Sequence, residues 1–291
     1  MKKFKRIFIE ISNMCNLACS FCPPSLRQVQ ALSTSQFEHI MQKLQGHGEH
    51  IYLHVKGEPL LHKDFEEILT LCSKYEKKVN ITTNGLLLDQ KGHIILKNPS
   101  VRLVNLSLQS YEENKGPDHH KAYLDKILNF VKKGMETTDI LFEFRLWNFD
   151  EDTNTTQETE DNQKILDYVE NFLGVNIPVT SQNTKGNTGH SQVYISKGTE
   201  FQWPSLTNDF VSTSGTCYGL RRQIAILSNG DVVPCCLDSE GVIKLGNIFE
   251  SDFESIVMSE HSKRIRTGFE NNKIIEDLCQ RCGYRKQYVT R

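Results

Sequence analysis

The sequence predicts an α/β fold, in which repeated strand–helix units build a parallel sheet or barrel and a smaller C-terminal segment follows. Three observations carry this prediction: the alternation of strand-like and helical segments, a division of the strands into an apolar and a polar face, and cysteines gathered near the two ends of the chain. Parallel strands need long crossover connections, and the helical segments supply them. A chain of 291 residues can bury one large core or two smaller ones.

The expected strands are five short apolar stretches, residues 7–11, 51–55, 79–83, 101–108 and 140–146. The segments that follow them carry apolar residues at helical spacing, namely Phe37, Ile40, Met41 and Leu44; Phe65, Ile68, Leu69 and Cys72; Tyr123, Ile127, Leu128 and Val131; and Ile165, Leu166, Val169, Phe172 and Leu173. Gly174 is expected to end the last of these helices. The acidic stretch 150–163 is expected to be a solvated loop, and residues 181–214 a linker or irregular segment.

Along each expected strand, alternate residues fall into an apolar register and a polar one. The polar register contains Glu10, Ser12, His54, Lys56, Asn80, Thr82, Asn84, Asn105, Ser107, Gln109, Glu143, Arg145 and Trp147. Such residues cannot form a dry core, so they line either a wide, incomplete barrel that holds a polar ligand or a sheet face open to solvent. We favour the barrel, because strands joined by crossover helices rarely leave a face exposed.

Charge and hydropathy argue against several partners. A formal net charge of -2 and a pI near 6.6 supply no basic face for nucleic acid or an anionic membrane surface. No run of about 18 apolar residues predicts a membrane span, and the first twelve residues do not read as a signal peptide. We therefore expect a cytoplasmic protein.

The nine cysteines are an odd number and are unevenly spaced, which favours metal binding over a disulfide framework. Cys15, Cys19 and Cys22 lie in one loop directly after the first expected strand. Four-iron clusters usually take four thiolates, so three would leave one iron open to another ligand. A structural zinc site would need a fourth ligand nearby, which makes zinc the second choice.

The C-x3-C-x2-C spacing, with Phe21 before its last cysteine, resembles the motif of radical S-adenosylmethionine (SAM) enzymes. That resemblance implies a [4Fe-4S] cluster whose open iron binds SAM and whose reduction releases a 5'-deoxyadenosyl radical that removes a substrate hydrogen. Gly57, Glu58 and Pro59 resemble part of the family's Gly-Gly-Glu-Pro motif, with Lys56 in place of its first glycine. The SAM-contacting residues that the resemblance further implies are Thr82, Asn84, Ser107, Gln109 and Arg145.

A second group of cysteines lies near the end of the chain. Residues 223–227 and 232–234 predict a β-hairpin with a turn at Asn229-Gly230, and a helical stretch at 253–265 would return the chain to close a four-cysteine site. Its members are Cys217, Cys235, Cys279 and Cys282, with Cys236 as the alternative to Cys235. Ligand types alone leave zinc and iron–sulfur open. The segment resembles the SPASM extension of radical SAM enzymes, or its single-cluster twitch form, which implies a second, auxiliary [4Fe-4S] cluster.

Together these observations lead us to expect a partial (β/α)6 TIM-type barrel over residues 1–180, a linker over 181–214 and an auxiliary cluster domain over 215–291. The single-cluster layout resembles aminocyclitol dehydrogenases, which implies oxidation of a small molecule with the auxiliary cluster as electron acceptor, Arg145 or Glu143 as proton acceptor, and a flavodoxin- or ferredoxin-type reductant. The alternatives are a peptide- or protein-modifying maturase and a non-catalytic zinc or iron–sulfur protein. Molybdenum-cofactor cyclases end in Gly-Gly, whereas this sequence ends Val289-Thr290-Arg291, and we expect that function less.

Overall fold

The structure is a computed structural model that describes residues 4–113, 117–147, 156–177, 185–199 and 202–288. Contacts within the chain divide it into two compact units. The first combines residues 1–79 with residues 201–291, and the second contains residues 80–200. In the described part of the chain, no helix has the length and apolar character needed to cross a membrane.

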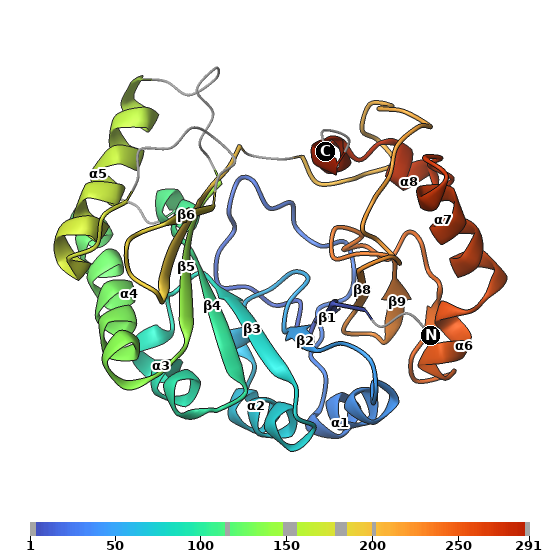
Figure 1. Cartoon of the computed structure of the whole chain (residues 1–291), viewed down its shortest axis with the longest axis horizontal. Helices are drawn as coiled ribbons and strands as arrows, with labels where there is room; N and C mark the ends of the chain where they lie inside the picture. Colours follow the sequence, from blue (N-terminus) through green and yellow to red (C-terminus); the bar gives the residue numbers. More distant parts are fainter. Residues whose placement is uncertain (1–3, 114–116, 148–155, 178–184, 200–201, 289–291) are drawn as a thin grey trace. The chain divides into compact units, whose positions relative to one another are not determined.

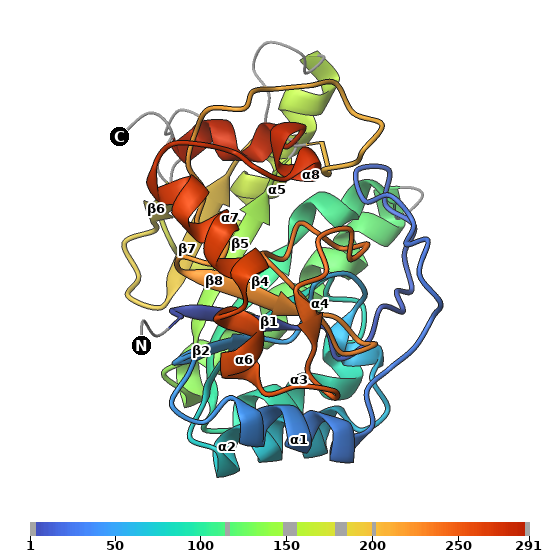
Figure 2. The ribbon, with the colours of Figure 1, turned by 90° about the vertical axis from the view of Figure 1, so that its right-hand side faces the viewer.

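In the first unit, the N-terminal strands and the C-terminal hairpin share one sheet. Its order is β10 (Gly246–Asn247), β9 (Asp231–Val233), β8 (Gln223–Ile226), β1 (Arg6–Ile9) and β2 (His50–Tyr52). β1 runs parallel to both β2 and β8, whereas β8, β9 and β10 are joined antiparallel. The predicted hairpin is therefore confirmed, and it continues the sheet beyond β1 (Figures 1 and 2).

Two helices of the first unit begin at serine residues whose side chains cap them. α1 (Thr34–Lys43) starts with a capping box formed by Ser33 and Gln36, and α2 (Phe65–Lys74) buries the apolar residues predicted from its spacing. The stretch 253–265, predicted as one helix, is instead α6 (Phe253–Val257) and α7 (Glu260–Glu270). The break has a local cause, because the Ser259 side chain accepts a hydrogen bond from the Ser262 N–H and starts a new helix. α8 (Asp277–Gln280) and the 3₁₀ helix η3 (Gly283–Tyr288) follow.

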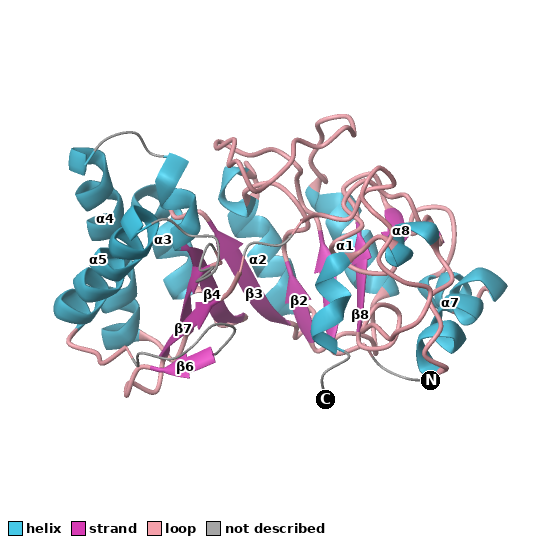
Figure 3. Cartoon of the chain, turned by 90° about the horizontal axis from the view of Figure 1, so that it is seen from above, coloured by secondary structure: helices cyan, strands magenta, loops and turns pink. Residues whose placement is uncertain are grey.

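The second unit contains the remaining parallel strands. Their order is β3 (Lys78–Thr83, which starts at the end of the first unit), β4 (Val101–Ser107), β5 (Leu141–Leu146), β7 (Val193–Lys197) and β6 (Lys185–Asn187). β4, β5 and β7 are parallel, and β6 is antiparallel to β7. Figures 1 and 3 show α3 (Leu88–Lys97), α4 (Pro117–Thr137) and α5 (Thr156–Leu173) on one side of these strands. The predicted end of α5 is confirmed, since Gly174 has a φ of 65°.

The predicted α/β fold class, a partial barrel of parallel strands with crossover helices, is confirmed, and so are the five strands. Three local predictions differ from the structure. Residues 181–214, predicted as irregular, contain β6 and β7, and β7 shows the alternation typical of a strand over only five residues. α3 was not predicted, because Gly92 interrupts its apolar spacing. Residues 156–163 begin α5 instead of forming a loop, while residues 148–155 lie outside the described part.

Most of the polar register of the strands is buried. Glu10, Asn80 and Asn105 are 0% exposed, and Glu143 is 3% exposed. The alternative of a sheet face open to solvent is therefore wrong for these positions. The predicted domain boundary near 180 falls in residues 178–184, outside the described part, and the predicted boundaries remain a prediction.

Candidate functional site

The first three cysteines lie in the loop between β1 and α1. Cys15 is exposed, whereas Cys19 and Cys22 are half-buried, and the Cys22 N–H donates to the Cys19 carbonyl at 3.0 Å. Phe21 is half-buried in the same loop. The end of β2 is tied to the start of this loop, because the Glu58 N–H donates to the Met14 carbonyl at 2.7 Å. The cysteine loop and the segment of Lys56 to Pro59 thus form one local structure.

Gly57 is required where this segment passes the cysteine loop. Its φ is 79°, and a Cβ there would lie 2.5 Å from the Ser12 carbonyl oxygen and 2.7 Å from that of Met14. Both contacts are with backbone, which cannot move aside as a side chain would. The Glu58 carboxylate is buried and accepts from the Leu60 N–H at 3.1 Å, which caps the 3₁₀ turn that begins at Pro59. A glycine is therefore needed for the chain after β2 to pack against the backbone of the cysteine loop.

Lys56, which departs from the family motif, directs its ammonium to the cysteine loop. Its Nζ donates to the Pro23 carbonyl, lies 3.9 Å from Glu240 Oε1 and is 4.9 Å from the centre of the Trp203 ring. Burial lowers the pKa of Lys56. Burial also raises the pKa of Cys22, and the positive charge of Lys56 acts in the opposite direction.

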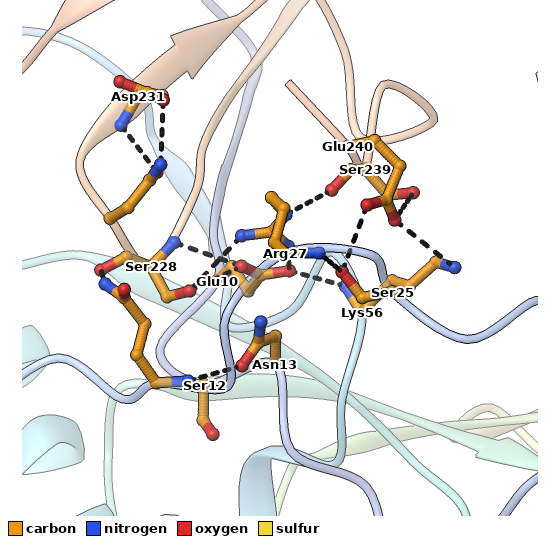
Figure 4. Close-up of polar contacts among 12 residues, drawn as sticks. Glu10, Ser12, Asn13, Ser25, Arg27, Lys56, Ser228, Asp231, Ser239 and Glu240 are labelled. Carbon is orange, nitrogen blue, oxygen red and sulfur yellow. Dashed lines mark hydrogen bonds and ion pairs between the residues drawn. The ribbon is translucent and has the colours of Figure 1, made fainter. Parts of the chain in front are cut away.

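Glu10 is the centre of a buried polar network that joins three parts of the first unit (Figure 4). Its Oε1 accepts from Arg27 Nη2 at 2.6 Å and from the Lys56 N–H at 3.2 Å. Its Oε2 accepts from the Ser228 N–H at 3.1 Å and from Ser228 Oγ at 2.8 Å. One carboxylate therefore connects the chain after Cys22, the end of β2 and the turn between β8 and β9.

The segment after Cys22 makes further bonds to the C-terminal part of the chain. Arg27 Nε donates to the Ser239 carbonyl at 2.7 Å, and the Leu26 N–H donates to Glu240 Oε2 at 2.9 Å. Gln30 Nε2 donates to the Ser228 carbonyl at 2.6 Å. Glu10 was predicted to lie in the polar register, but these bonds of Arg27 and Gln30 were not predicted, because residues 212 and 198 positions apart leave no periodic signal.

The four predicted C-terminal ligands, Cys217, Cys235, Cys279 and Cys282, line one cavity. Cys217 lies in the loop before β8, and Cys235 lies two residues after β9. Cys279 lies in α8, and Cys282 lies two residues after that helix. Cys236 does not line this cavity and packs instead against a hydrophobic cluster of Phe8, Val55, Ala225, Leu227 and Val233. The bend and turn that follow β9 thus place the two adjacent cysteines in different surroundings.

The four thiols are half-buried and line the cavity, and their burial raises the pKa of each thiol. Burial raises the pKa of Cys217 to about 11 and holds those of Cys235 and Cys279 well above the usual value. Thiolates at these positions therefore need a compensating positive charge, such as a metal centre supplies. Among the described residues, no three His, Cys, Asp or Glu side chains converge as ligands of a single ion. A four-iron cluster requires no such convergence, because each thiolate binds a different iron.

In the second unit, the predicted SAM and catalytic residues lie on neighbouring strands. The β4–β5 register places Ser107 opposite Arg145, and Arg145 Nε lies 3.2 Å from Glu143 Oε1. The Arg145 guanidinium also lies 4.8 Å from the centre of the Trp147 ring, whose Nε1 donates to Ser196 Oγ at 3.3 Å. Arg145, predicted to pair with a ligand carboxylate, already pairs with Glu143.

Some of the remaining polar residues bond to the protein, and others have an acceptor atom with no hydrogen-bond partner within the described protein. Asn105 Nδ2 donates to Thr82 Oγ1 at 3.1 Å, and Asn84 Oδ1 accepts from the Leu86 N–H at 3.0 Å, which holds the turn after β3. Asn105 Oδ1 and Gln109 Oε1 are buried acceptors that have no hydrogen-bond partner within the described protein. Buried acceptors of this kind fit a ligand that carries hydroxyl or amino donors.

Sequence comparison identifies the class of protein to which this fold and these cysteines belong. Residues 9–155 match the radical SAM superfamily, and residues 217–283 match SPASM, an iron–sulfur cluster-binding domain. The first match covers just over half of the 291 residues, so the chain belongs to the radical SAM superfamily. The radical SAM domain implies SAM and a [4Fe-4S] cluster, and the SPASM domain implies auxiliary iron–sulfur binding.

Curated relatives differ in what they make. A GTP 3',8-cyclase of Synechocystis is 31% identical over 114 residues, which are 38% of this chain and 35% of the cyclase. The sporulation killing factor maturation protein SkfB of Bacillus subtilis is 38% identical over 80 residues, 27% of this chain and 20% of SkfB. The subtilosin biosynthesis protein AlbA of the same species is 25% identical over 268 residues, 86% of this chain and 58% of AlbA. The chain thus spans about a third or less of the first two relatives.

Solved structures share the fold over nearly the whole chain. BtrN in complex with AdoMet and 2-DOIA has a TM-score of 0.61 at 16% identity, covering 97% of this chain and 94% of BtrN. SuiB of Streptococcus suis bound to its precursor peptide SuiA has a TM-score of 0.60 at 18% identity, covering 92% of this chain and 67% of SuiB. At these identities the likeness establishes the fold alone.

Proposed function

We propose that this enzyme oxidises a small molecule by radical SAM chemistry, with two [4Fe-4S] clusters. Cys15, Cys19 and Cys22 would hold the SAM cluster, and the four cysteines around the C-terminal cavity would hold the auxiliary cluster. The observation that carries the proposal is this second, separate set of four thiols. Four protein ligands leave no iron open for substrate, which favours an electron-transfer role. When bound, SAM and the first cluster supply a hydrogen-abstracting 5'-deoxyadenosyl radical, and the second cluster supplies a one-electron acceptor.

The residues of the first unit would hold SAM and its cluster. The absence of a side chain at Gly57 lets the chain after β2 pass against the backbone of the cysteine loop, and the hydrogen bond from the Glu58 N–H to the Met14 carbonyl keeps that backbone beside Cys15. Glu58 and Pro59 shape the turn that follows. Lys56 fixes the chain after Cys22 through the Pro23 carbonyl. A flavodoxin- or ferredoxin-type protein would supply the electron that starts the reaction.

Oxidation of a secondary alcohol by this route also requires a proton acceptor. A guanidinium has no acceptor atom, so Arg145 is the weaker choice of the two predicted residues. Glu143 is buried, and its Oε1 lies 3.2 Å from Arg145 Nε. We assign proton acceptance to Glu143 and its orientation to Arg145. Asn105 and Gln109 would supply acceptors for ligand donors.

Peptide modification is the second candidate. SuiB is solved with a precursor peptide, SkfB is named for maturation of a sporulation killing factor, and AlbA, named for biosynthesis of the bacteriocin subtilosin, matches along 86% of this chain. A peptide substrate would undergo the same hydrogen abstraction by the first site. The C-terminal cavity would then serve the same one-electron acceptor role.

The test is an iron count combined with a SAM cleavage assay on protein purified and reconstituted without oxygen. We expect about eight irons per chain, and about four in the Cys15→Ala/Cys19→Ala/Cys22→Ala variant. Dithionite-dependent 5'-deoxyadenosine formation should be lost in that variant. Zinc in place of the second four irons would refute the oxidative mechanism, and absence of 5'-deoxyadenosine from the wild-type protein would refute radical SAM activity.

Substrate class is tested separately with deuterated substrates. Incubation with pools of deuterated polyols and of deuterated peptides, followed by mass spectrometry of 5'-deoxyadenosine, shows which pool donates the hydrogen atom. Deuterium from the polyol pool supports small-molecule oxidation. Deuterium from the peptide pool alone would replace it with peptide modification.

A further inference from the structure

Arg285 lies beside the C-terminal four-cysteine cavity, and neither the motif nor the fold comparison assigns it a role. It lines the cavity together with Cys217, Cys279 and Cys282, and it is only 3% exposed. Arg285 is the third residue after the last cysteine, in η3. A lone arginine in such a short segment has no sequence signal that would mark it.

Three backbone carbonyls hold the guanidinium in place. Nε donates to Cys279 at 2.9 Å, Nη1 to Ser214 at 2.9 Å and Nη2 to Ser212 at 2.6 Å. One of these carbonyls belongs to a predicted cluster ligand. The guanidinium therefore has a fixed position relative to the cysteine pair at 279 and 282.

The neighbouring chain leaves room for this group. Gly215 has a φ of 136°, and a Cβ there would lie 2.6 Å from Arg285 Nη1. A glycine at position 215 is thus needed for the Arg285 guanidinium to lie this close to the backbone. Both this glycine and the three hydrogen bonds therefore accommodate the arginine.

No carboxylate in the described part of the chain forms an ion pair with Arg285. Asp238 lines the same cavity, but its two oxygens accept from the Val242 and Ile243 N–H groups, each at 2.8 Å. A guanidinium cannot lose its proton, and a buried charge is costly unless an opposite charge compensates it. The thiolates of Cys217 and Cys282, which line the same cavity as Arg285, would supply that charge.

We propose that Arg285 is the buried counter-charge of the auxiliary cluster and raises its reduction potential. One-electron reduction adds a negative charge to the site, and a fixed cation nearby stabilises that product more than the oxidised form. Arg285 thereby makes the site a better electron acceptor. This inference rests on the proposed function, because it requires an iron–sulfur cluster at the four cysteines.

The experiment isolates the auxiliary site by using the Cys15→Ala/Cys19→Ala/Cys22→Ala background, reconstituted without oxygen. Iron and zinc are counted first, and the midpoint potential is then measured by a redox titration followed by electron paramagnetic resonance. In the Arg285→Gln variant we expect the one-electron reduction constant to fall about tenfold, which is about 59 mV. Arg285→Lys, which keeps the charge, should fall less.

The matched control is Arg281→Gln. Arg281 adjoins Cys282 in sequence but lies nearer to solvent and pairs with Asp277 at 3.2 Å, so its charge is screened. We expect little change of potential in that variant. Equal shifts in both glutamine variants would show a general charge effect and overturn the assignment.

The remaining outcomes separate this inference from the proposed function. An unchanged potential in Arg285→Gln with four irons retained overturns the role of Arg285 alone. Zinc in the background protein overturns both proposals. Loss of iron in Arg285→Gln but not in Arg285→Lys supports the counter-charge, whereas loss in both variants shows that the hydrogen-bonding fork is what matters and overturns it.

Discussion

The two cysteine sites of the first unit are built in opposite ways. Cys15, Cys19 and Cys22 come from a single loop and range from exposed to half-buried. The C-terminal four come from separate segments that close around a cavity, and burial raises the pKa of each. A three-thiol site on one loop leaves room for a small molecule to enter, while a four-thiol site enclosed by the chain excludes one. Access of a small molecule, more than the type of ligand, therefore distinguishes the proposed catalytic site from the proposed electron acceptor.

The largest effect is expected at the enclosed site, where two adjacent cysteines have different surroundings. Cys235→Ser should remove about four irons per chain, because Cys235 faces the cavity. Cys236→Ser should keep all of the iron, because Cys236 packs against the hydrophobic cluster of Phe8 and Val55. Iron and sulfide counts on the two reconstituted variants check this. Retention of iron in Cys235→Ser with loss in Cys236→Ser would reverse the assignment.

A second contrast uses one glycine from each site. Gly57→Ala should weaken SAM binding at least a hundredfold, or about 3 kcal/mol, because the new Cβ meets backbone at 2.5 Å in a left-handed conformation. Gly283→Ala, next to Cys282, is the control, since a Cβ there meets nothing within 4 Å. Equilibrium dialysis of SAM against both reconstituted variants measures the difference. Equal affinities would show that the approach of the β2 end to the loop does not form the SAM site.

The sequence predicted the larger features of both sites, because they depend on local patterns. Strand–helix alternation predicted the parallel fold, the C-x3-C-x2-C spacing predicted the first loop, and the Asn229-Gly230 turn predicted the hairpin that carries Cys235. β7 was missed, because five alternating residues between glycine-rich stretches give a weak signal. Arg285 and the partners of Glu10 were missed for a different reason. Arg285 bonds to residues 71 and 73 positions away and Glu10 bonds to Ser228, 218 positions away, and no local pattern encodes such contacts.

The smallest expected effect concerns the network that links the two sites. Glu10 is fully buried and accepts four hydrogen bonds, from Arg27, Lys56 and both donors of Ser228. Glu10→Gln keeps the shape but removes the charge that Arg27 needs, so the free energy of unfolding should fall by about 2 kcal/mol. Urea unfolding of the reduced apoprotein measures this change.

The control for Glu10 is Glu38→Gln on α1, whose carboxylate pairs with Lys74 at 2.6 Å on the surface. Exposed ion pairs contribute little to stability, so this variant should unfold nearly as the wild type does. Because Glu10 touches the chain after Cys22 and the hairpin turn at Ser228, its loss should also lower iron retention at both sites together. If iron is lost at one site alone, or if the two variants unfold alike, then the open and the enclosed site are stabilised independently and Glu10 does not join them.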